Sequence, residues 1–292
     1  MRIGIATPVV VAHPSTRQAW ESDATIDDLA HIAALADRLG FHHLTCSEHV
    51  AVPVEVAHER GGTYWDPLAT LGFLAARTDR IRLATQVVVL GYHHPLAIAK
   101  RYGTLDRVSG GRLILGLGVG SLEAEFDLLG ASFADRGARA DDALVALRGS
   151  MSTATPSHHG AFYDYRDVVI EPHAVQPRVP FWIGGRTMRS LRRGLEHGDG
   201  WVPFGLGPAE LQTMLTRVTV PPTFEVVLST GTPLDPTDRA RTGRALSRLR
   251  DVGATIANVS IAARSADHYC EQLERLHRIA GDEGATFGES RD

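Results

Sequence analysis

Short runs of hydrophobic residues alternate along this chain with longer stretches in which apolar residues recur every three or four positions. Runs of the first kind predict β-strands, and the three-and-four spacing predicts amphipathic helices. The expected strands cover residues 2–8, 42–47, 81–90, 112–115, 179–183, 200–202, 224–228 and 256–261. The expected helices cover residues 25–39, 67–77, 95–108, 122–129 with 138–148, 188–197, 208–218, 237–252 and 266–280.

Eight expected strands, each followed by a helix, are the count of a (β/α)₈ TIM barrel, a member of the α/β class. A doubly wound open sheet would also alternate, but eight repeats over this length fit it less well. The stretch around residues 152–177 is richer in Pro, His and Tyr and contains a short β-like run at 168–170. We interpret it as an excursion from the barrel that could shape a substrate pocket, and we expect one domain over residues 1–292.

Composition narrows the classes of partner. The 292 residues carry a formal net charge of -4, with acidic and basic residues intermixed, and 43% of them are hydrophobic. Such a chain predicts no nucleic-acid or membrane partner and favours a small-molecule substrate. The longest apolar runs fall short of the ~20 residues of a spanning helix, and the opening residues are too quickly interrupted for a signal peptide, so a cytoplasmic location is expected.

In a TIM barrel, ligand sites lie at the carboxyl ends of the strands. Ser47, Glu48 and His49 follow the second expected strand, where a carboxylate and an imidazole stand side by side. These two groups can orient or move protons near neutral pH. From position alone, a Glu and a His that only cap the next loop account for them equally well.

Two glycine-rich segments follow other strands. Gly116 to Gly120 lacks the third glycine of a dinucleotide fingerprint, because Ser121 stands at that place, and a tight turn explains the segment as well as a ligand loop does. Gly184, Gly185, Arg186 and Thr187 follow the fifth strand and precede a helix. Free N–H donors, a hydroxyl and an arginine at a helix start suit a phosphate group.

Metal and nucleophile chemistry find no support. The histidine pairs at 42–43, 93–94 and 158–159 are adjacent in the chain, and adjacent side chains on a strand point to opposite faces, so the first two pairs make no natural chelate. We therefore expect no metal site. A nucleophile elbow is also missing from the sequence, and Cys46 lies within an expected strand.

Linked motifs give the chain a family resemblance. They are Ser47-Glu48-His49, Tyr64-Trp65-Asp66-Pro67-Leu68-Ala69, Arg80-Ile81-Arg82-Leu83-Ala84-Thr85, Arg107-Val108-Ser109-Gly110-Gly111-Arg112, Glu125-Phe126 and Phe181-Trp182-Ile183-Gly184-Gly185. In this order they resemble the bacterial luciferase-like monooxygenase superfamily, and within it the branch that uses the deazaflavin coenzyme F(420). The resemblance covers residues 2–280.

The resemblance implies roles for individual residues. A non-proline cis peptide would join Gln86 and Val87 beneath the flavin ring, with His49 as the proton mover and Glu48 as its orienter. Gly118, Val119 and Gly120 match the loop along the ribityl chain, and Gly184, Gly185, Arg186 and Thr187 match the phosphate loop. Ser121 and Pro53 stand where sugar-phosphate dehydrogenases of the superfamily have a glutamate and a tryptophan, so glucose 6-phosphate is not the expected substrate.

The implied function is hydride transfer between coenzyme F(420) and a small organic substrate. Two alternatives stay open: an FMN-dependent monooxygenase that uses O₂, and a protein that binds the deazaflavin without catalysis. By analogy with superfamily members, a homodimer is expected.

Overall fold

The computed structural model describes residues 1–288, so residues 289–292 of the expected domain lie outside the described residues. Within residues 1–288, eight parallel strands close into a barrel, as the sequence predicts, because β3 pairs with both β2 and β5. The barrel strands are β1 (Arg2–Ile5), β2 (His43–Cys46), β3 (Arg82–Thr85) with β4 (Val88–Val89), β5 (Leu113–Gly118), β8 (Phe181–Gly184), β9 (Gly200–Val202), β10 (Glu225–Ser229) and β11 (Ile256–Val259).

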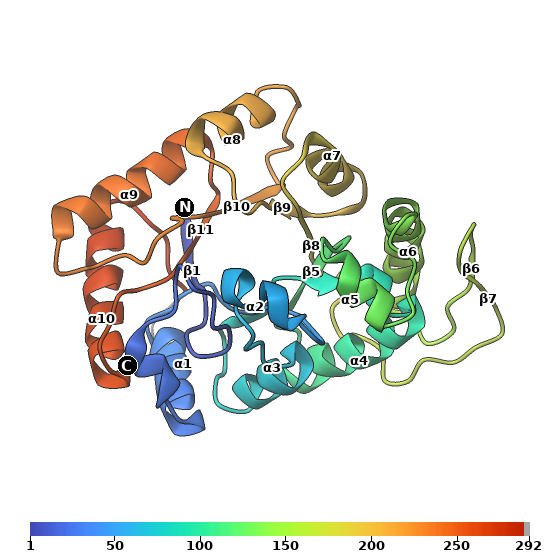
Figure 1. Ribbon diagram of the computed structural model, residues 1–292, viewed down its shortest axis with the longest axis horizontal. Helices are drawn as coiled ribbons and strands as arrows, with labels where there is room; N and C mark the ends of the chain where they lie inside the picture. Colours follow the sequence, from blue (N-terminus) through green and yellow to red (C-terminus); the bar gives the residue numbers. More distant parts are fainter. Residues whose placement is uncertain (289–292) are drawn as a thin grey trace.

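Helices surround this barrel in chain order (Figure 1). They are α1 (Ile26–Arg38), α3 (Pro67–Ala75), α4 (Pro95–Val108), α6 (Arg136–Ser150), α7 (Met188–His197), α8 (Pro208–Leu215), α9 (Arg239–Val252) and α10 (Ala266–Asp282). Two short helices, α2 (Val54–Arg60) and α5 (Glu123–Leu128), lie inside the outer ring in this view, and the 3₁₀ turns η1 (Ala19–Ser22) and η2 (Leu90–Tyr92) lie in connecting segments.

Local signals set several helix starts. Asp66 caps α3 by accepting from the Ala69 N–H, and Pro67 occupies the first helical position, where its missing N–H costs nothing. Thr25 caps α1 in a reciprocal pair with Asp28. These caps fix where the helices begin relative to the strand ends, and thereby the length of each loop above the barrel.

Several strands are shorter than expected, since those expected at 2–8 and 256–261 end at Ile5 and Val259, and two further differences shape the cavity. The expected strand at 81–90 divides into β3 and β4 around a cis peptide bond between Gln86 and Val87, the bond that the resemblance implies. The expected strand at 112–115 continues to Gly118, so its first glycines belong to the sheet and not to a loop. A Cβ at Gly116 would lie 1.9 Å from the Thr85 carbonyl oxygen. Glycine here therefore allows the two strands to approach.

The excursion at 152–177 forms a small antiparallel hairpin of β6 (His158–His159) and β7 (Asp164–Tyr165) that extends outside the ring of helices (Figure 1). The β-like run at 168–170 is not a strand, because Val169 is 71% exposed and Pro172, which has no N–H to donate, follows closely. The expectation that this segment shapes the substrate pocket is wrong as well, since none of its residues lines the main cavity described below.

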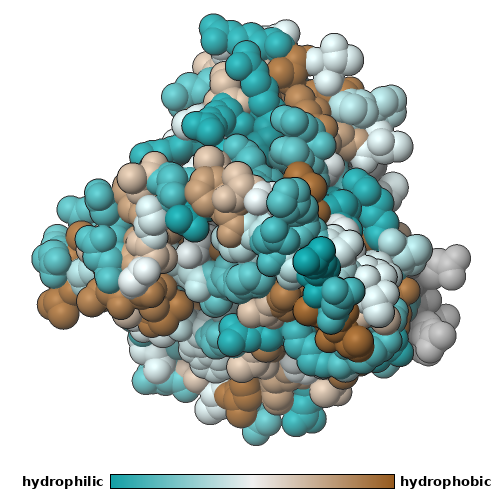
Figure 2. Space-filling model, turned by 90° about the vertical axis from the view of Figure 1, so that its right-hand side faces the viewer, coloured by the Kyte–Doolittle hydropathy of each residue, from teal (hydrophilic) through white to brown (hydrophobic). Residues whose placement is uncertain are grey.

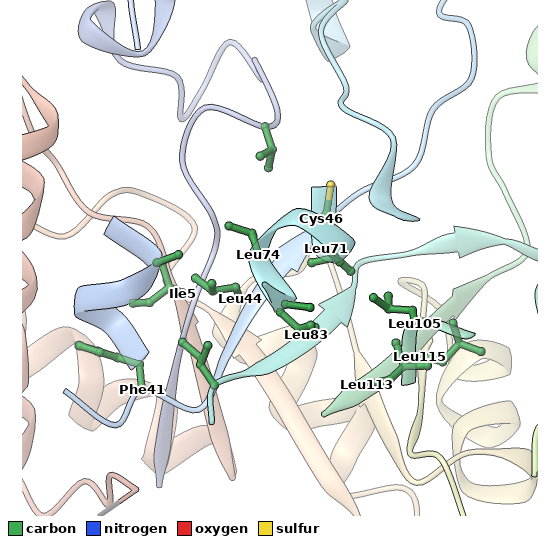
Figure 3. Packing of buried hydrophobic residues seen from close by; sticks show 14 of the residues in the cluster. Ile5, Phe41, Leu44, Cys46, Leu71, Leu74, Leu83, Leu105, Leu113 and Leu115 are labelled. Carbon is green, nitrogen blue, oxygen red and sulfur yellow. The ribbon is translucent and has the colours of Figure 1, made fainter. Parts of the chain in front are cut away.

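The hydrophobic core lies between the barrel and the helices. Outward side chains of β1, β2, β3 and β5, such as Leu44 and Leu83, meet Leu71 and Leu74 of α3 and Leu105 of α4 (Figure 3). A second, smaller cluster fills the barrel itself and contains Ala84, Ile114, Trp182, Val202, Val227 and Ile256. The strands are thus packed on both faces, as expected for a parallel barrel.

His42 and His43 depart from the expected opposite orientations. His42 precedes β2 by one residue, so the alternation of a strand does not apply to it, and its Nδ1 atom lies 3.0 Å from Nδ1 of His43. The two imidazoles are perpendicular and lie beside Trp182 inside the amino-terminal end of the barrel.

The surface is mixed in character. On the face that Figure 2 shows, hydrophilic residues surround separate hydrophobic patches. In the described part of the chain, no helix combines the length and apolar character needed to cross a bilayer.

Candidate active site

A cavity of about 640 Å³ opens at the carboxyl ends of the barrel strands. A volume in this range suits a cofactor together with a small substrate. The predicted site residues that line it are Glu48, His49, Gln86, Val87, Gly118, Val119, Gly120, Gly184, Gly185 and Arg186. Thr187 does not line the cavity: its hydroxyl caps α7 by accepting from the Ser190 N–H at 3.3 Å. The expected phosphate contact of Thr187 stays a prediction, since a hydroxyl that accepts from the Ser190 N–H can still donate its own proton.

His49 is held by a carboxylate from another part of the chain. Its Nδ1 lies 2.7 Å from Oε2 of Glu125 on α5, and its ring packs edge-on against Tyr64 with 4.5 Å between centroids. Because Glu125 occupies Nδ1, the Nε2 atom is the one that can exchange a proton with a ligand. In residues 1–288, no group hydrogen-bonds to this Nε2.

Glu125 is fully buried and accepts four hydrogen bonds. Tyr92 Oη donates to Oε2 at 2.7 Å, and the main-chain N–H groups of Val50 and Ala51 donate to Oε1 at 2.6 and 3.1 Å. Burial alone would raise the pKa of Glu125, but the hydrogen bonds from His49, Tyr92 and Ala51 outweigh it and hold the pKa below its usual value. Glu125 is therefore an anion that fixes both the His49 ring and the loop after it.

Glu48 does not orient His49, contrary to the expectation from their adjacency. Its Oε1 lies 2.7 Å from Nε2 of His93, and its Oε2 accepts from the Val89 N–H at 2.7 Å. Glu48 and His49 lie beyond the end of β2, and their side chains point to different partners: Glu48 contacts the chain at β4, and His49 contacts α5. Glu48 thus ties the chain after the cis bond to the end of β2.

The Val87 side chain forms an apolar surface at the bottom of the cavity, between Gly118 and Gly184, and we call this surface the Val87 shelf. A Cβ at Gly118 would lie 2.5 Å from Val87 Cγ2, and one at Gly184 would lie 2.8 Å from Val87 Cγ1. The Ser47 hydroxyl donates to the Gln86 carbonyl at 2.6 Å and so fixes the cis bond that carries Val87. A bare backbone on both sides of an apolar shelf suits a flat aromatic ring.

Cationic groups lie at the rim. Arg186 is exposed after β8, and Arg60 of α2 donates to the Ser121 hydroxyl at 3.2 Å across the mouth. Within residues 1–288, neither guanidinium has a carboxylate within the 4.0 Å that defines an ion pair. Gly185, at φ 141°, and Gly120, at φ 80°, bend the chain near these arginines in conformations that favour glycine. The rim can therefore receive an anionic group.

Sequence reasoning missed several polar residues of this site. Glu125 was recognised only as part of a family motif, Tyr92 and Arg60 not at all, and His93 only as a rejected metal ligand. The signal available for Glu125 was its place one turn after the glycine segment. In the described residues, His, Cys, Asp and Glu side chains form no group of three that could hold a metal ion.

Comparison with known proteins places this geometry in a family. The family model described as luciferase-like monooxygenase matches residues 1–281. An uncharacterised protein of Mycobacterium tuberculosis is 29% identical over 199 residues, which cover 64% of this chain and 68% of that protein. The oxygenase component of a flavin-dependent trigonelline monooxygenase of Acinetobacter baylyi is 25% identical over 194 residues, 65% of this chain and 52% of that protein.

Solved structures share the fold. The monooxygenase RslO1 from Streptomyces bottropensis superposes with a TM-score of 0.78 at 22% identity, covering 98% of this chain and 100% of that one. An F(420)-dependent secondary alcohol dehydrogenase in complex with an F(420)–acetone adduct superposes with a TM-score of 0.69 at 14% identity, covering 94% and 98%. At these identities the likeness shows the fold alone.

Proposed function

The chain belongs to the luciferase-like monooxygenase family and is an oxidoreductase of that family, and on this premise we propose that it transfers a hydride between coenzyme F(420) and a small organic substrate. The observation that carries the proposal is the pairing of His49 with Glu125 above the Val87 shelf. It presents one proton-exchanging nitrogen to a cavity whose floor suits a flat ring.

The residues of this chain fit such a cofactor. Val87, with Gly118 and Gly184 beside it, would support the ring, and Val119 and Gly120 would follow the sugar-alcohol chain. Arg186 and the main chain of Gly185 would hold the phosphate. When bound, a deazaflavin supplies a ring carbon that gives or takes a hydride and reacts poorly with oxygen.

His49 would manage the proton that accompanies hydride transfer. Oxidation of an alcohol, for example, releases a hydroxyl proton, and a neutral Nε2 can accept it while Glu125 stabilises the imidazolium that results. In the reverse direction the same atom returns the proton. Tyr92 stays protonated, because burial and its hydrogen bond to Glu125 raise its pKa, and it acts as a donor that keeps Glu125 in place.

A second candidate function is FMN-dependent monooxygenation. The observation that favours it is that some relatives are named as monooxygenases. One is a 4-hydroxyprotoasukamycin monooxygenase of Streptomyces nodosus subsp. asukaensis, which is 39% identical over 117 residues, 40% of this chain and 29% of that protein. The same shelf and rim would hold FMN, and reduced flavin would then be supplied from outside the chain.

Titration of the purified protein with F(420) and with FMN, followed by the quenching of each cofactor's fluorescence, tests these proposals. Micromolar or tighter binding of F(420), with FMN much weaker, is the expected result. The reverse preference, together with oxygen uptake, would favour the monooxygenase. Binding without turnover in any donor–acceptor screen would leave a cofactor-binding protein, and binding of neither cofactor would overturn the proposal.

We also propose a homodimer, on analogy with the family. Light scattering after gel filtration tests it, and a mass of one chain, 31.6 kDa, would contradict it.

A further inference from the structure

Charged and polar side chains occupy the amino-terminal half of the barrel interior, where TIM barrels are usually filled with apolar residues. Arg2 Nη2 lies 2.6 Å from Glu225 Oε1, and Trp182 Nε1 donates to Glu225 Oε2 at 2.6 Å. A second cavity of about 280 Å³ adjoins this cluster at the end of the barrel opposite the candidate active site. The charges of the cluster are thus paired, Arg2 and Glu225 are partly exposed toward this second cavity, and the proposed proton transfer does not use them.

The hydrogen bonds that leave Arg2 have a defined direction. Arg2 Nη1 lies 3.0 Å from His42 Nε2, and a guanidinium can only donate, so His42 Nε2 is the acceptor. Burial lowers the pKa of His42 to about 2 and that of His43 to about 3, so both rings are neutral. His42 therefore carries its proton on Nδ1 and donates it to His43 Nδ1, 3.0 Å away. His43 must then carry its proton on Nε2.

The next acceptor is Asn258. A Cβ at Gly4 would lie 2.0 Å from the His43 ring, so the ring occupies the notch left by that glycine, and Gly4 is paired in register with Asn258. His43 Nε2 and Asn258 Oδ1 are both buried, and within residues 1–288 neither atom forms a hydrogen bond, with the other or with any third group. The tautomer derived above makes His43 Nε2 a donor, and Asn258 Oδ1 is an acceptor, so two unsatisfied atoms of complementary chemistry lie beside the same glycine.

The series continues into the active-site cavity. Asn258 Nδ2 donates to Gln86 Oε1 at 2.8 Å, which leaves the Gln86 amide with its Nε2 donor uncommitted in residues 1–288. Gln86 lines the cavity beside Val87. The opposite orientation of the Asn258 amide would set two donors against each other at His43, which costs more than a lost hydrogen bond. The Gln86 amide would follow whichever orientation Asn258 takes, so the discrimination comes from His43.

We propose that a hydrogen bond from His43 Nε2 to Asn258 Oδ1 completes a one-way series, Arg2 to His42 to His43 to Asn258 to Gln86, and that this series fixes the Gln86 amide so that its NH₂ group donates a hydrogen bond to an acceptor atom of the cofactor ring. The inference rests on the proposed function, since it needs a ring on the Val87 shelf. Gln86 touches the cofactor in this scheme, whereas His43 and Asn258 are positioning residues that act through it.

The direction of the series can be tested without any cofactor. Proton–nitrogen correlation spectra of the ¹⁵N-labelled protein report which ring nitrogen of each histidine is protonated. The expected tautomers are Nδ1–H for His42 and Nε2–H for His43. Protonation of His42 on Nε2, or of His43 on Nδ1, would overturn the proposal.

Two substitutions, at different residues, each replace the Gln86 NH₂ donor that faces the cofactor ring with an acceptor oxygen. Gln86→Glu places a carboxylate oxygen where the NH₂ group lies, and Asn258→Asp accepts from both neighbours, so that the Gln86 amide turns its oxygen toward the ring. Both are close in size to the residues they replace. Each is expected to weaken cofactor binding about tenfold, the value of one hydrogen bond, and to shift the absorption maximum of the bound cofactor.

The matched control is Gln212→Glu, since Gln212 is an exposed residue of α8 that does not line the cavity, and its cofactor affinity should change less than about twofold. Unchanged affinity and spectrum in both Gln86→Glu and Asn258→Asp, with a wild-type protein that binds the cofactor, would overturn the role of Gln86 and leave the proposed function standing. A wild-type protein that binds neither F(420) nor FMN would overturn both.

Discussion

His49 Nδ1 lies 2.7 Å from Oε2 of Glu125, a residue 76 positions away in the chain, while its sequence neighbour Glu48 faces His93. Two separate carboxylate–imidazole pairs therefore lie at the cavity wall: His49 lines the cavity and Glu125 lies behind it, whereas in the other pair Glu48 lines the cavity and His93 lies behind. The pair with Glu125 exposes a ring nitrogen to the cavity, and the pair with Glu48 holds the strand after the cis bond. Substitutions in the His49–Glu125 pair should therefore affect proton transfer, and those in the Glu48–His93 pair should affect the backbone beside the cis bond.

Replacing His49 with Ala should reduce turnover about 100-fold while the affinity for cofactor changes little, because the side chain moves a proton and does not hold the ring. Steady-state kinetics with a substrate found by screening hydride donors, beside fluorescence titration of cofactor, measures both quantities. His58→Ala, an exposed histidine of α2, is the control. Full activity without the His49 imidazole would remove it from the mechanism.

Replacing Glu125 with Gln should lower the free energy of unfolding by about 3 kcal/mol, because the amide NH₂ must face donors at a fully buried position. Urea denaturation measures the change. Glu123→Gln, an exposed residue of the same helix, should change stability by less than about 0.5 kcal/mol. Equal effects of the two substitutions would show that the Glu125 contacts add nothing to stability.

Glu125 should also make the free energy of unfolding depend on pH in the acid range. Its pKa in the folded protein is lower than the usual 4.5, so its contribution is complete above pH 4.5 and is lost as pH falls through the folded value. Urea midpoints of wild type and Glu125→Gln measured from pH 7 down to pH 3 should therefore converge at the acid end. A constant difference across that range would contradict the depressed pKa.

Adding a methyl group at Gly118 should weaken cofactor binding at least tenfold and cost about 1–3 kcal/mol of stability, because the new Cβ would lie 2.5 Å from Val87 Cγ2. Fluorescence titration and urea denaturation read the two effects. Gly149→Ala in α6 meets nothing within 4 Å and should stabilise the protein by up to about 1 kcal/mol. Normal cofactor affinity in Gly118→Ala would mean that the ring does not lie on the Val87 shelf.

Replacing Arg186 with Gln should weaken the binding of F(420) about fivefold to tenfold and leave unaffected the binding of its deazaflavin core from which the phosphate has been removed. The difference should shrink at high salt, because Arg186 is exposed. Arg189→Gln serves as the control, since that exposed side chain is directed toward Asp141, 3.7 Å away. Equal losses of affinity for F(420) and for its phosphate-free core would exclude a phosphate contact.

The barrel could be predicted from sequence because each strand and helix carries its own signal. Hydrophobic runs, the Asp66–Pro67 helix start and glycine stops are local, and eight repeats of them allow few closed arrangements. The split of the expected strand at Gln86–Val87 followed from family resemblance and not from the local pattern, which reads as one continuous run. The extension of β5 through Gly118 was missed, because glycine reads as a turn unless the neighbouring strand is known.

The side-chain partners at the site could not be predicted in the same way. Pairs such as His49 with Glu125 join segments far apart in the chain, and adjacency in sequence favoured Glu48 instead. Thr187 was expected to contact phosphate, and its hydroxyl oxygen also caps α7 by accepting from the Ser190 N–H, a local role that the motif alone does not indicate. Polar contacts between distant segments depend on the register in which the strands pair, and that register cannot be derived from a single sequence.

The notch at Gly4 constrains how this protein can change over evolutionary time. Because the His43 imidazole fills the space that any side chain at position 4 would need, substitutions at the two positions are not independent. A lineage that acquires alanine at position 4 must first, or at once, exchange His43 for a smaller residue. In relatives that keep this barrel interior, residues 4 and 43 should therefore vary as a pair, and the order of their replacement should be one-way.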